Sequence, residues 1–252
     1  MRAWCRFAKA NYAVPEFFAM AAQSLAGGVT AGRLASWSSQ DACNTLWSLV
    51  ATDSRHEELA SLCLQMLARR ADEGGAVDRM HRTQLQQFML WWEVELRLPP
   101  APWLQNNPML REQCRAAMAA GDVRVGHTVS ALQASVSRAL SRLNVYHMHE
   151  IHTAEGYSVD IILPERRIAL EVDGPHHFTQ HGKPTGATVL KRRQLRATGW
   201  SMVAIPYYEW YRMNGNGQQE CEYLFNMIMN PAQPTHADYT AGWIKDGVPG
   251  GW

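Results

Sequence analysis

The chain has almost no net charge, because its 252 residues include 24 Lys and Arg against 23 Asp and Glu. With 46% hydrophobic residues, this balance excludes an intrinsically disordered chain, which combines low apolar content with a large net charge. It also excludes a strongly basic nucleic-acid binder of the histone type. The 18 Gly and 12 Pro are too few for a collagen-like or low-complexity protein. No apolar run approaches the roughly eighteen residues of a transmembrane helix. What remains is a globular chain of one large or two smaller domains.

Paired cysteines are also lacking. The five cysteines are scattered, odd in number and without a CxxC pair: Cys5, Cys43, Cys63, Cys114 and Cys221. A disulfide framework or a structural zinc site is therefore not expected. The spacing is typical of small buried apolar side chains in a reducing compartment.

The N-terminal half has the apolar spacing of helices and looks internally repeated. Helices are predicted at about 41–51, with Ser38, Ser39 and Asp41 as candidate caps, and at about 56–71. An earlier segment, WCRFAKANYAVPEFFAMAAQSLA, has the same form, and its offset drifts from 43 at Trp4/Trp47 to 41 at Glu16/Glu57. A two-helix repeat of about forty residues is the signature of an α-solenoid.

Two interpretations of the first fifteen residues follow. Arg2, Arg6 and Lys9 without an acid have the composition of a transit peptide. Alternatively, this segment is a repeat helix without its own cap. In that case the chain is expected to be the C-terminal part of a longer array, since at least three repeats are usually needed for stability. Further helices are predicted at about 78–97, which the PPAPW segment ends, and at about 108–120 and 127–143.

From about 145 the helical period gives way to alternation. Strands are predicted at about 157–163 and 168–173, joined by PERR. If Leu163 pairs with Ile168, Asp160 falls opposite Glu171 and Ser158 opposite Asp173. One face then holds the apolar side chains Val159, Ile161, Leu163, Ile168, Leu170 and Val172. The other face holds three carboxylates: Asp160, Glu171 and Asp173.

Like charges opposite one another destabilise a hairpin. The three carboxylates therefore need a divalent cation, a shared proton that raises one pKa, or a nearby basic group, unless they splay apart into solvent. After the Gly174-Pro175 turn come His176 and His177, which are weak metal-ligand candidates and more often cap a turn or bond to a carboxylate.

A helix is predicted at about 187–198, ended by Gly199 at its C′ position, and a strand, WSMVAIP, follows it. The order strand–strand–helix–strand indicates an α/β unit with a crossover helix. The helix carries four cations that form either a solvated face or a phosphate-contacting surface: Lys191, Arg192, Arg193 and Arg196.

At these residues the chain resembles a known family. IALEVDGPHHF, the spacing to TVLKRRQLRATGW and the ending MVAIPYYEW look like the RAP domain, an RNA-binding module, over about 145–212. SWSSQDACNTLWSLVAT resembles, more loosely, the helical repeats of FAST-kinase-like and octotricopeptide-type organellar proteins. The resemblance implies an RNA-binding factor of the mitochondrion or chloroplast that acts in RNA processing, stability or translation.

RAP domains also look like the PD-(D/E)XK nuclease fold of the very-short-patch-repair endonucleases. There, an Asp and a Glu-x-Lys on neighbouring strands bind a divalent metal that activates water. Carried over, the metal ligands are Asp160 and Glu171 with Asp173, Mg²⁺ or Mn²⁺ is the cofactor, and His177 orients. The departure is that Asp173 stands where the motif has Lys, which puts hydrolysis in doubt. Lys191 is a candidate replacement from outside the strand.

The fold expected is therefore an α-helical, solenoid-like repeat region at 1–143, a small α/β restriction-endonuclease-like RAP domain at 144–230 and a tail at 231–252. RNA binding without catalysis is the leading hypothesis, with the four cations as RNA contacts. The alternatives are a metal-dependent endoribonuclease and a protein-interaction scaffold. The partners expected are RNA and an organellar RNA–protein complex, with no membrane insertion.

Overall fold

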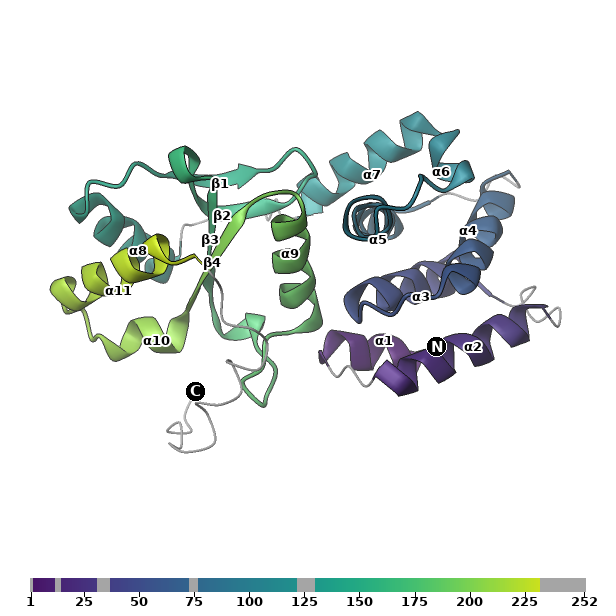
Figure 1. The fold of residues 1–252 in the computed structure, drawn as a ribbon, viewed down its shortest axis with the longest axis horizontal. Coiled ribbons are helices and arrows are strands. Elements are labelled where there is room, and N and C mark those ends of the chain that lie inside the picture. Colours follow the sequence, from purple (N-terminus) through teal and green to yellow (C-terminus); the bar gives the residue numbers. More distant parts are fainter. Residues whose placement is uncertain (1, 12–14, 31–36, 73–76, 122–129, 232–252) are drawn as a thin grey trace.

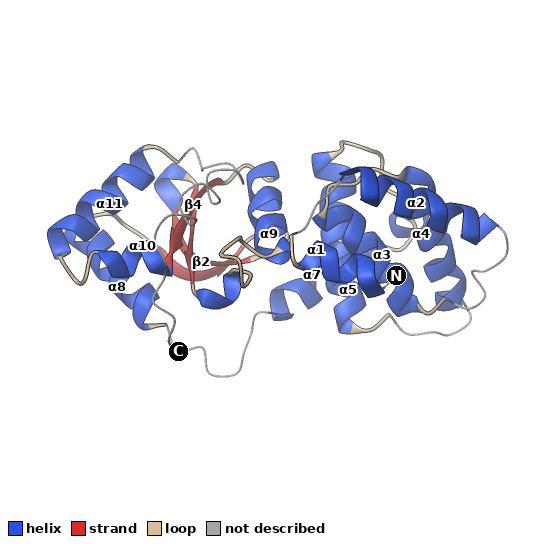
Figure 2. Cartoon of the chain, turned by 90° about the horizontal axis from the view of Figure 1, so that it is seen from below, coloured by secondary structure: helices blue, strands red, loops and turns tan. Residues whose placement is uncertain are grey.

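The computed structural model describes residues 2–11, 15–30, 37–72, 77–121 and 130–231. Two lobes lie side by side along the long axis of the molecule (Figure 1). One lobe is a stack of helices from the first half of the chain. The other is a four-stranded sheet with helices on both faces (Figure 2).

The helical lobe is built from neighbouring helix pairs. Its α-helices are α1 (Arg2–Lys9), α2 (Pro15–Thr30), α3 (Ser39–Ala51), α4 (Glu57–Asp72), α5 (Arg79–Met89), α6 (Pro102–Gln105) and α7 (Pro108–Gly121). A π-helical segment, η2 (Leu90–Glu95), extends α5. Helix α1 packs beside α3, α2 beside α4, and α5 against both α3 and α7. The helices predicted at 41–51, 56–71, 78–97 and 108–120 are all present.

The start of α3 follows the cap prediction. Ser38 is the N-cap, its side-chain oxygen accepts the Asp41 N–H, and its own N–H donates to the Asp41 carboxylate. This capping box satisfies backbone donors that the first helical turn leaves unpaired.

The two proposed repeat units bury equivalent residues. Trp4 and Trp47 are both buried, as are Ala8 and Ala51. Because α1 also packs into the core of the helical lobe, its residues behave as those of a repeat helix. The geometry is that of stacked helix pairs, while the assignment to a particular repeat family stays a prediction.

The second lobe holds a mixed sheet of order β1-β2-β3-β4. Its strands are β1 (Met148–His152), β2 (Ser158–Leu163), β3 (Ile168–Asp173) and β4 (Ser201–Pro206). Strands β1, β2 and β3 pair antiparallel, and β3 pairs parallel with β4 through the crossover helix α9 (Gly186–Ala197). The predicted strands and crossover helix are confirmed, and Gly199 follows α9 with a φ of 89° as expected of a C′ residue.

The predicted register between β2 and β3 is confirmed for the pairs Ile161–Leu170, Ile162–Ala169 and Leu163–Ile168, but the predicted pairs Asp160–Glu171 and Ser158–Asp173 do not form. The predicted apolar face is wrong at one position. Val159 does not join the cluster of Ile161 and Leu163 but packs with Ile162 on the opposite face. The physical reason is that the pairing of β2 with β3 ends at Ile161, and Asp160 is also skipped between the β1–β2 pairs His149–Ile161 and Ile151–Val159, so the alternation of side chains is interrupted there.

Helices cover each face of the sheet with a separate core. On one face lie α8 (Ala131–Arg142), α10 (Tyr207–Arg212) and α11 (Gly217–Met229), which pack on Leu170 and Val203. On the other face lies α9, where Leu195 packs on Ala169 and Met202. Strand β1 and helices α6 and α11 were not predicted individually. The alternation in β1 is obscured because its side chains are only partly buried.

Helix α9 also forms the wall between the two lobes (Figure 1). Leu190 belongs to the core of the helical lobe. Arg193 donates to the Glu95 carboxylate and to the Val50 carbonyl, both at 2.5 Å. Gln194 donates to the Gln87 carbonyl at 2.7 Å. The spacing 190, 193, 194 places these residues on one stripe of the helix.

The packing of α8 affects where the boundary between the two domains lies. Helix α8 shares its core with the sheet rather than with α1–α7, so we propose a boundary before Ser130 in place of 143/144. Apart from Pro231, the predicted tail lies outside the described residues. Among the described residues, no helix is both long and apolar enough to cross a membrane. The five cysteines are unpaired thiols, four of them buried.

One glycine tests the contact between the lobes. A Cβ on Gly186, at the start of α9, would overlap the Ala8 carbonyl oxygen of α1. We expect Gly186→Ala to lower the thermal unfolding midpoint, since backbone atoms must move to admit the methyl group. Gly27→Ala in α2 is the matched control, because a Cβ there meets nothing within 4 Å. It should be neutral or stabilising by about 0.5–1 kcal/mol. Equal midpoints for the two variants would contradict the α1–α9 contact.

Candidate functional site

Strand β3 presents two carboxylates to α9. Every residue from Ile168 to Asp173 is buried. Because side chains alternate along a strand, Leu170 and Val172 enter the core beneath α8, while Glu171 and Asp173 point to the opposite face. Their exposed fractions are 3% and 1%. Ionised carboxylates at such depth require partners.

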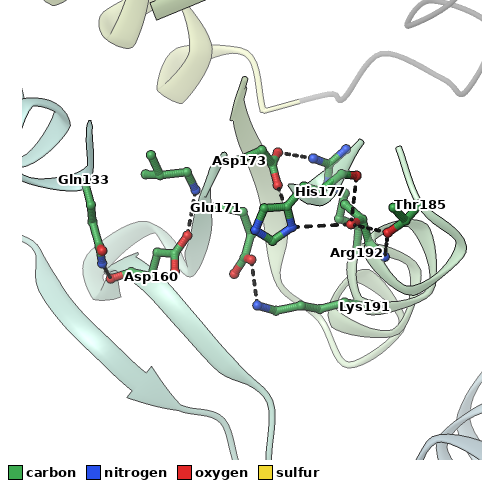
Figure 3. Close-up of polar contacts among 10 residues, drawn as sticks. Gln133, Asp160, Glu171, Asp173, His177, Thr185, Lys191 and Arg192 are labelled. Atoms are coloured by element: carbon green, nitrogen blue, oxygen red, sulfur yellow. Dashed lines mark hydrogen bonds and ion pairs between the residues drawn. The ribbon is translucent and has the colours of Figure 1, made fainter. Parts of the chain in front are cut away.

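Helix α9 supplies those partners (Figure 3). The Lys191 ammonium donates to Glu171 Oε2 at 2.6 Å. The Arg192 guanidinium donates to Asp173 Oδ2, and both of these side chains are buried. Lys191 and Arg192, which are consecutive in α9, thus pair with Glu171 and Asp173, which lie on the same face of β3. From the sequence, a divalent cation, a shared proton or a nearby basic group was considered as the means of neutralising these carboxylates. The structure has a basic side chain beside each of the two.

Asp160, the third carboxylate, lies at the edge of the ladder. Its Oδ2 accepts the Val172 N–H at 2.8 Å, and its carbonyl accepts Gln133 Nε2 at 3.2 Å (Figure 3). The backbone pairing of β2 with β3 ends at Ile161–Leu170, so the carboxylate takes the place of a strand carbonyl for Val172. This contact holds the Asp160 charge beside Glu171 and Asp173.

The three carboxylates shift one another's pKa values. Burial is the largest cause and raises the pKa of Glu171 to about 8, which Lys191 opposes and the Asp160 charge reinforces. Burial likewise raises the pKa of Asp173 to about 6, with Arg192 opposing. Lys191 and Arg192 thus oppose the effect of burial and favour the ionised carboxylates.

His177 closes the end of the cluster from a short 3₁₀ turn, η4 (Pro175–His177). Its Nδ1 lies 3.5 Å from Asp173 Oδ1 and 3.4 Å from the Thr188 hydroxyl. Burial, with His176 and the two cations adding to it, lowers the pKa of His177 to about 3. The ring is therefore neutral at physiological pH and contacts Asp173 as a polar neighbour. This matches the interpretation of a turn histidine beside a carboxylate.

The four predicted cations do not share a surface. Lys191 and Arg192 face the sheet, and Arg193 faces the helical lobe. Arg196, near the end of α9, is exposed. Their proposed contacts with RNA stay a prediction, which this geometry favours for Arg196.

The residues present do not fit a metal centre in this arrangement. One oxygen of each β3 carboxylate is already held by a cation, and Asp160 is held by a backbone N–H. Among the residues described, no three or more His, Cys, Asp or Glu side chains are placed to hold an ion together. A buried oxygen without a hydrogen-bond partner is left on Glu171 and on Asp173. A metal at these residues stays a prediction that requires the ion pairs to open.

Sequence reasoning missed the polar contacts that carry the site across to the helical lobe. Tyr157 donates its hydroxyl to Gln194 Oε1 at 2.7 Å and accepts from Gln87 Nε2 at 3.3 Å. Gln194 is fully buried. A glutamine at a helix position that the apolar spacing assigns to the core is the signal that could have located this network.

Comparison with known proteins agrees with the resemblance. Residues 170–227 match the family model described as RAP domain. The chain is 38% identical over 100 residues to a protein of Oryza sativa subsp. japonica named RAP domain-containing protein, chloroplastic. That alignment covers 39% of this chain and 15% of the relative. The chain therefore carries a RAP domain at 170–227, and that domain contains Glu171, Asp173 and all four cations of α9.

The buried pair of Arg192 and Asp173 can be tested by removing one partner. We expect Arg192→Met to lower the free energy of unfolding by about 3–5 kcal/mol, because Asp173 is left buried and uncompensated. Arg196→Met on the same helix is the matched control and should change it by less than about 0.5 kcal/mol. Both values come from urea denaturation, and adding Asp173→Asn to Arg192→Met should recover part of the loss. Similar losses for Arg192→Met and Arg196→Met would contradict the pairing.

Proposed function

We propose that this chain is an organellar RNA-binding factor that acts in RNA processing, stability or translation, and that its RAP domain binds RNA without cleaving it. The observation that carries the proposal is the RAP domain at 170–227, together with the resemblance of that domain to an RNA-binding module. The name of the rice relative favours the chloroplast over the mitochondrion. The chain spans 15% of that relative, so further regions of such a protein can contribute to the process it serves.

The charges of the site support binding over cleavage. In the nuclease motif the strand cation lies free to stabilise a developing anion, whereas here Asp173 occupies its position. Lys191 brings a cation to Glu171 from α9, but it does so as an ion-pair partner at 2.6 Å. Phosphate contacts are expected from exposed cations, and Arg196 on the same helix is one of these.

The nuclease alternative is favoured by one observation. Glu171 Oε1 and Asp173 Oδ1 are buried without hydrogen-bond partners. Carboxylate oxygens without partners can coordinate a cation. Against it, a metal would have to displace Lys191 or Arg192 from buried pairs. The scaffold alternative predicts partner proteins that stay bound after RNase treatment, whereas RNA-tethered partners are lost.

A single charge reversal tests RNA binding without disturbing the buried pairs. We expect Arg196→Glu to weaken binding of single-stranded RNA and to lower the slope of log affinity against log salt by roughly 0.7, the value of one phosphate contact. Fluorescence anisotropy across a KCl series measures both quantities. Arg138→Glu is the control, because Arg138 is exposed on α8, which covers the opposite face of the sheet. An unchanged slope in Arg196→Glu would remove Arg196 from the RNA contact.

Incubation with metal tests the absence of cleavage. We expect Mg²⁺ and Mn²⁺ to leave the thermal unfolding midpoint unchanged and to leave structured and single-stranded RNA intact, since Lys191 and Arg192 already neutralise the carboxylates. The contrary result is EDTA-sensitive cleavage that disappears in Asp160→Ala and Glu171→Ala but persists in Glu165→Ala, whose carboxylate lies on the exposed β2–β3 turn.

A further inference from the structure

A small aromatic pocket lies outside the carboxyl ends of the two parallel strands. Strand β3 ends at Asp173 and β4 at Pro206. The pocket has a volume of about 210 Å³ and is lined by Pro175, Phe178, Thr179, Gln180, Gly182, Tyr207 and Tyr208. In open α/β sheets, ligands bind in the crevice outside the carboxyl ends of strands. None of the lining residues belongs to the carboxylate cluster.

The rings that line the pocket are held in fixed positions. Phe178 contacts Tyr207 and Tyr208 edge to face, with centroids 6.0 and 5.5 Å apart. Tyr207 and Tyr208 are 5.5 Å apart and begin α10 directly after Pro206. Trp210 in the same helix is buried and donates to the Ser135 hydroxyl at 2.7 Å. This contact fixes α10 on α8 and keeps the two tyrosines at the strand ends.

The opposite wall is a closed loop. Phe178 forms an isolated bridge with Pro184, and the Thr179 N–H donates to the Lys183 carbonyl at 2.7 Å. The Gly182 N–H donates to the Thr179 carbonyl at 2.9 Å, and Gly182 has a φ of 72° that favours glycine. The loop is therefore already shaped before any ligand enters.

The residues that line the pocket carry no charge, while cationic residues neighbour them in the sequence. Lys183 and His181 are exposed on the loop, and Arg212 is exposed one helical turn after Tyr208. Glu209, the one acid of α10, accepts the Tyr223 hydroxyl at 2.7 Å. A ligand that suits this site has a flat uncharged body and anionic flanks.

The volume narrows the class of ligand. Pockets for drug-sized molecules occupy about 300–1,000 Å³, so this one suits a single flat ring system. An unstacked nucleobase meets every requirement, because it stacks on aromatic side chains while its flanking phosphates meet cations. We propose that this pocket takes one unpaired base of a single-stranded RNA, with Tyr208 as the stacking residue and Lys183 and Arg212 contacting the adjacent phosphates. The inference rests on the proposed RNA-binding function.

The test compares two probes on the full chain. One is oligouridine of roughly ten nucleotides, within the site sizes of single-strand binders. The other is a ribose-phosphate oligomer of equal length without bases. Tyr208→Ala should weaken oligouridine binding by about 5- to 150-fold, the range for loss of one stacked base. It should leave the abasic probe unchanged, and Tyr208→Phe should restore binding. Tyr146→Ala, at a residue 62% exposed before β1, is the control.

The results of this test separate failure of the base pocket from failure of the proposed RNA binding. Unchanged oligouridine binding in Tyr208→Ala, or equal weakening of both probes, overturns the base pocket while RNA binding itself stands. If the wild-type chain binds neither probe, the proposed function fails with it. RNA binding that survives in Tyr208→Ala while a protein partner is lost assigns the pocket to that partner.

A second measurement needs no variant. Light-induced cross-linking of wild-type chain to RNA that contains 4-thiouridine should attach RNA to segments 175–183 or 207–208. Cross-links confined to other segments overturn the proposal even where Tyr208→Ala does not fold.

Discussion

The burial of two carboxylates on β3 is the constraint from which the arrangement of the RAP domain follows. Glu171 and Asp173 lie on a strand that is buried on both faces, and neither can be left there without a cation. Lys191 and Arg192 meet this requirement only if α9 lies directly over β3 with one fixed rotation about its axis. Buried ion pairs add little net stability compared with apolar residues of the same size, but a helix that slides or rotates would leave charges unpaired. The pairs therefore specify the position of α9.

Fixing α9 on the sheet also fixes the helical lobe. The stripe of α9 that faces away from the sheet carries Leu190, Arg193 and Gln194, and these three contact the helical lobe through its core, Glu95, Val50 and Gln87. Tyr157 joins the same network from the sheet side. The two lobes thus share one helix. If the RAP domain binds RNA as proposed, that contact is held at a defined orientation to the stacked helices.

The sequence allowed most of this fold to be predicted, because periodicity reports burial. The helices at 41–51 and 56–71, the β2–β3 register and the crossover helix all follow from apolar spacing. The face of Val159 could not be predicted, since it depends on Asp160 bonding to the Val172 N–H and ending the ladder, which is a tertiary event. The partners of the four cations could not be predicted from the sequence either. Helical spacing separates Arg193 from Lys191 and Arg192, but nothing local says that both sides of α9 are covered.

The charge pattern has a different meaning once these contacts are known. From sequence, cations crowded on one helix and acids on one hairpin face indicate two opposed surface patches. In the fold, Lys191 and Arg192 meet Glu171 and Asp173 inside the molecule, so those charges largely cancel and project little field into solvent. In the proposed RNA contact, attraction for phosphate would therefore come from exposed cations outside these buried pairs, such as Arg196, Lys183 and Arg212. The proposed recognition also draws on uncharged contacts. Aromatic rings at the strand ends are groups of that kind. The acidic cluster and the aromatic pocket therefore have separate roles. The cluster fixes the position of α9, and the pocket is the proposed ligand site.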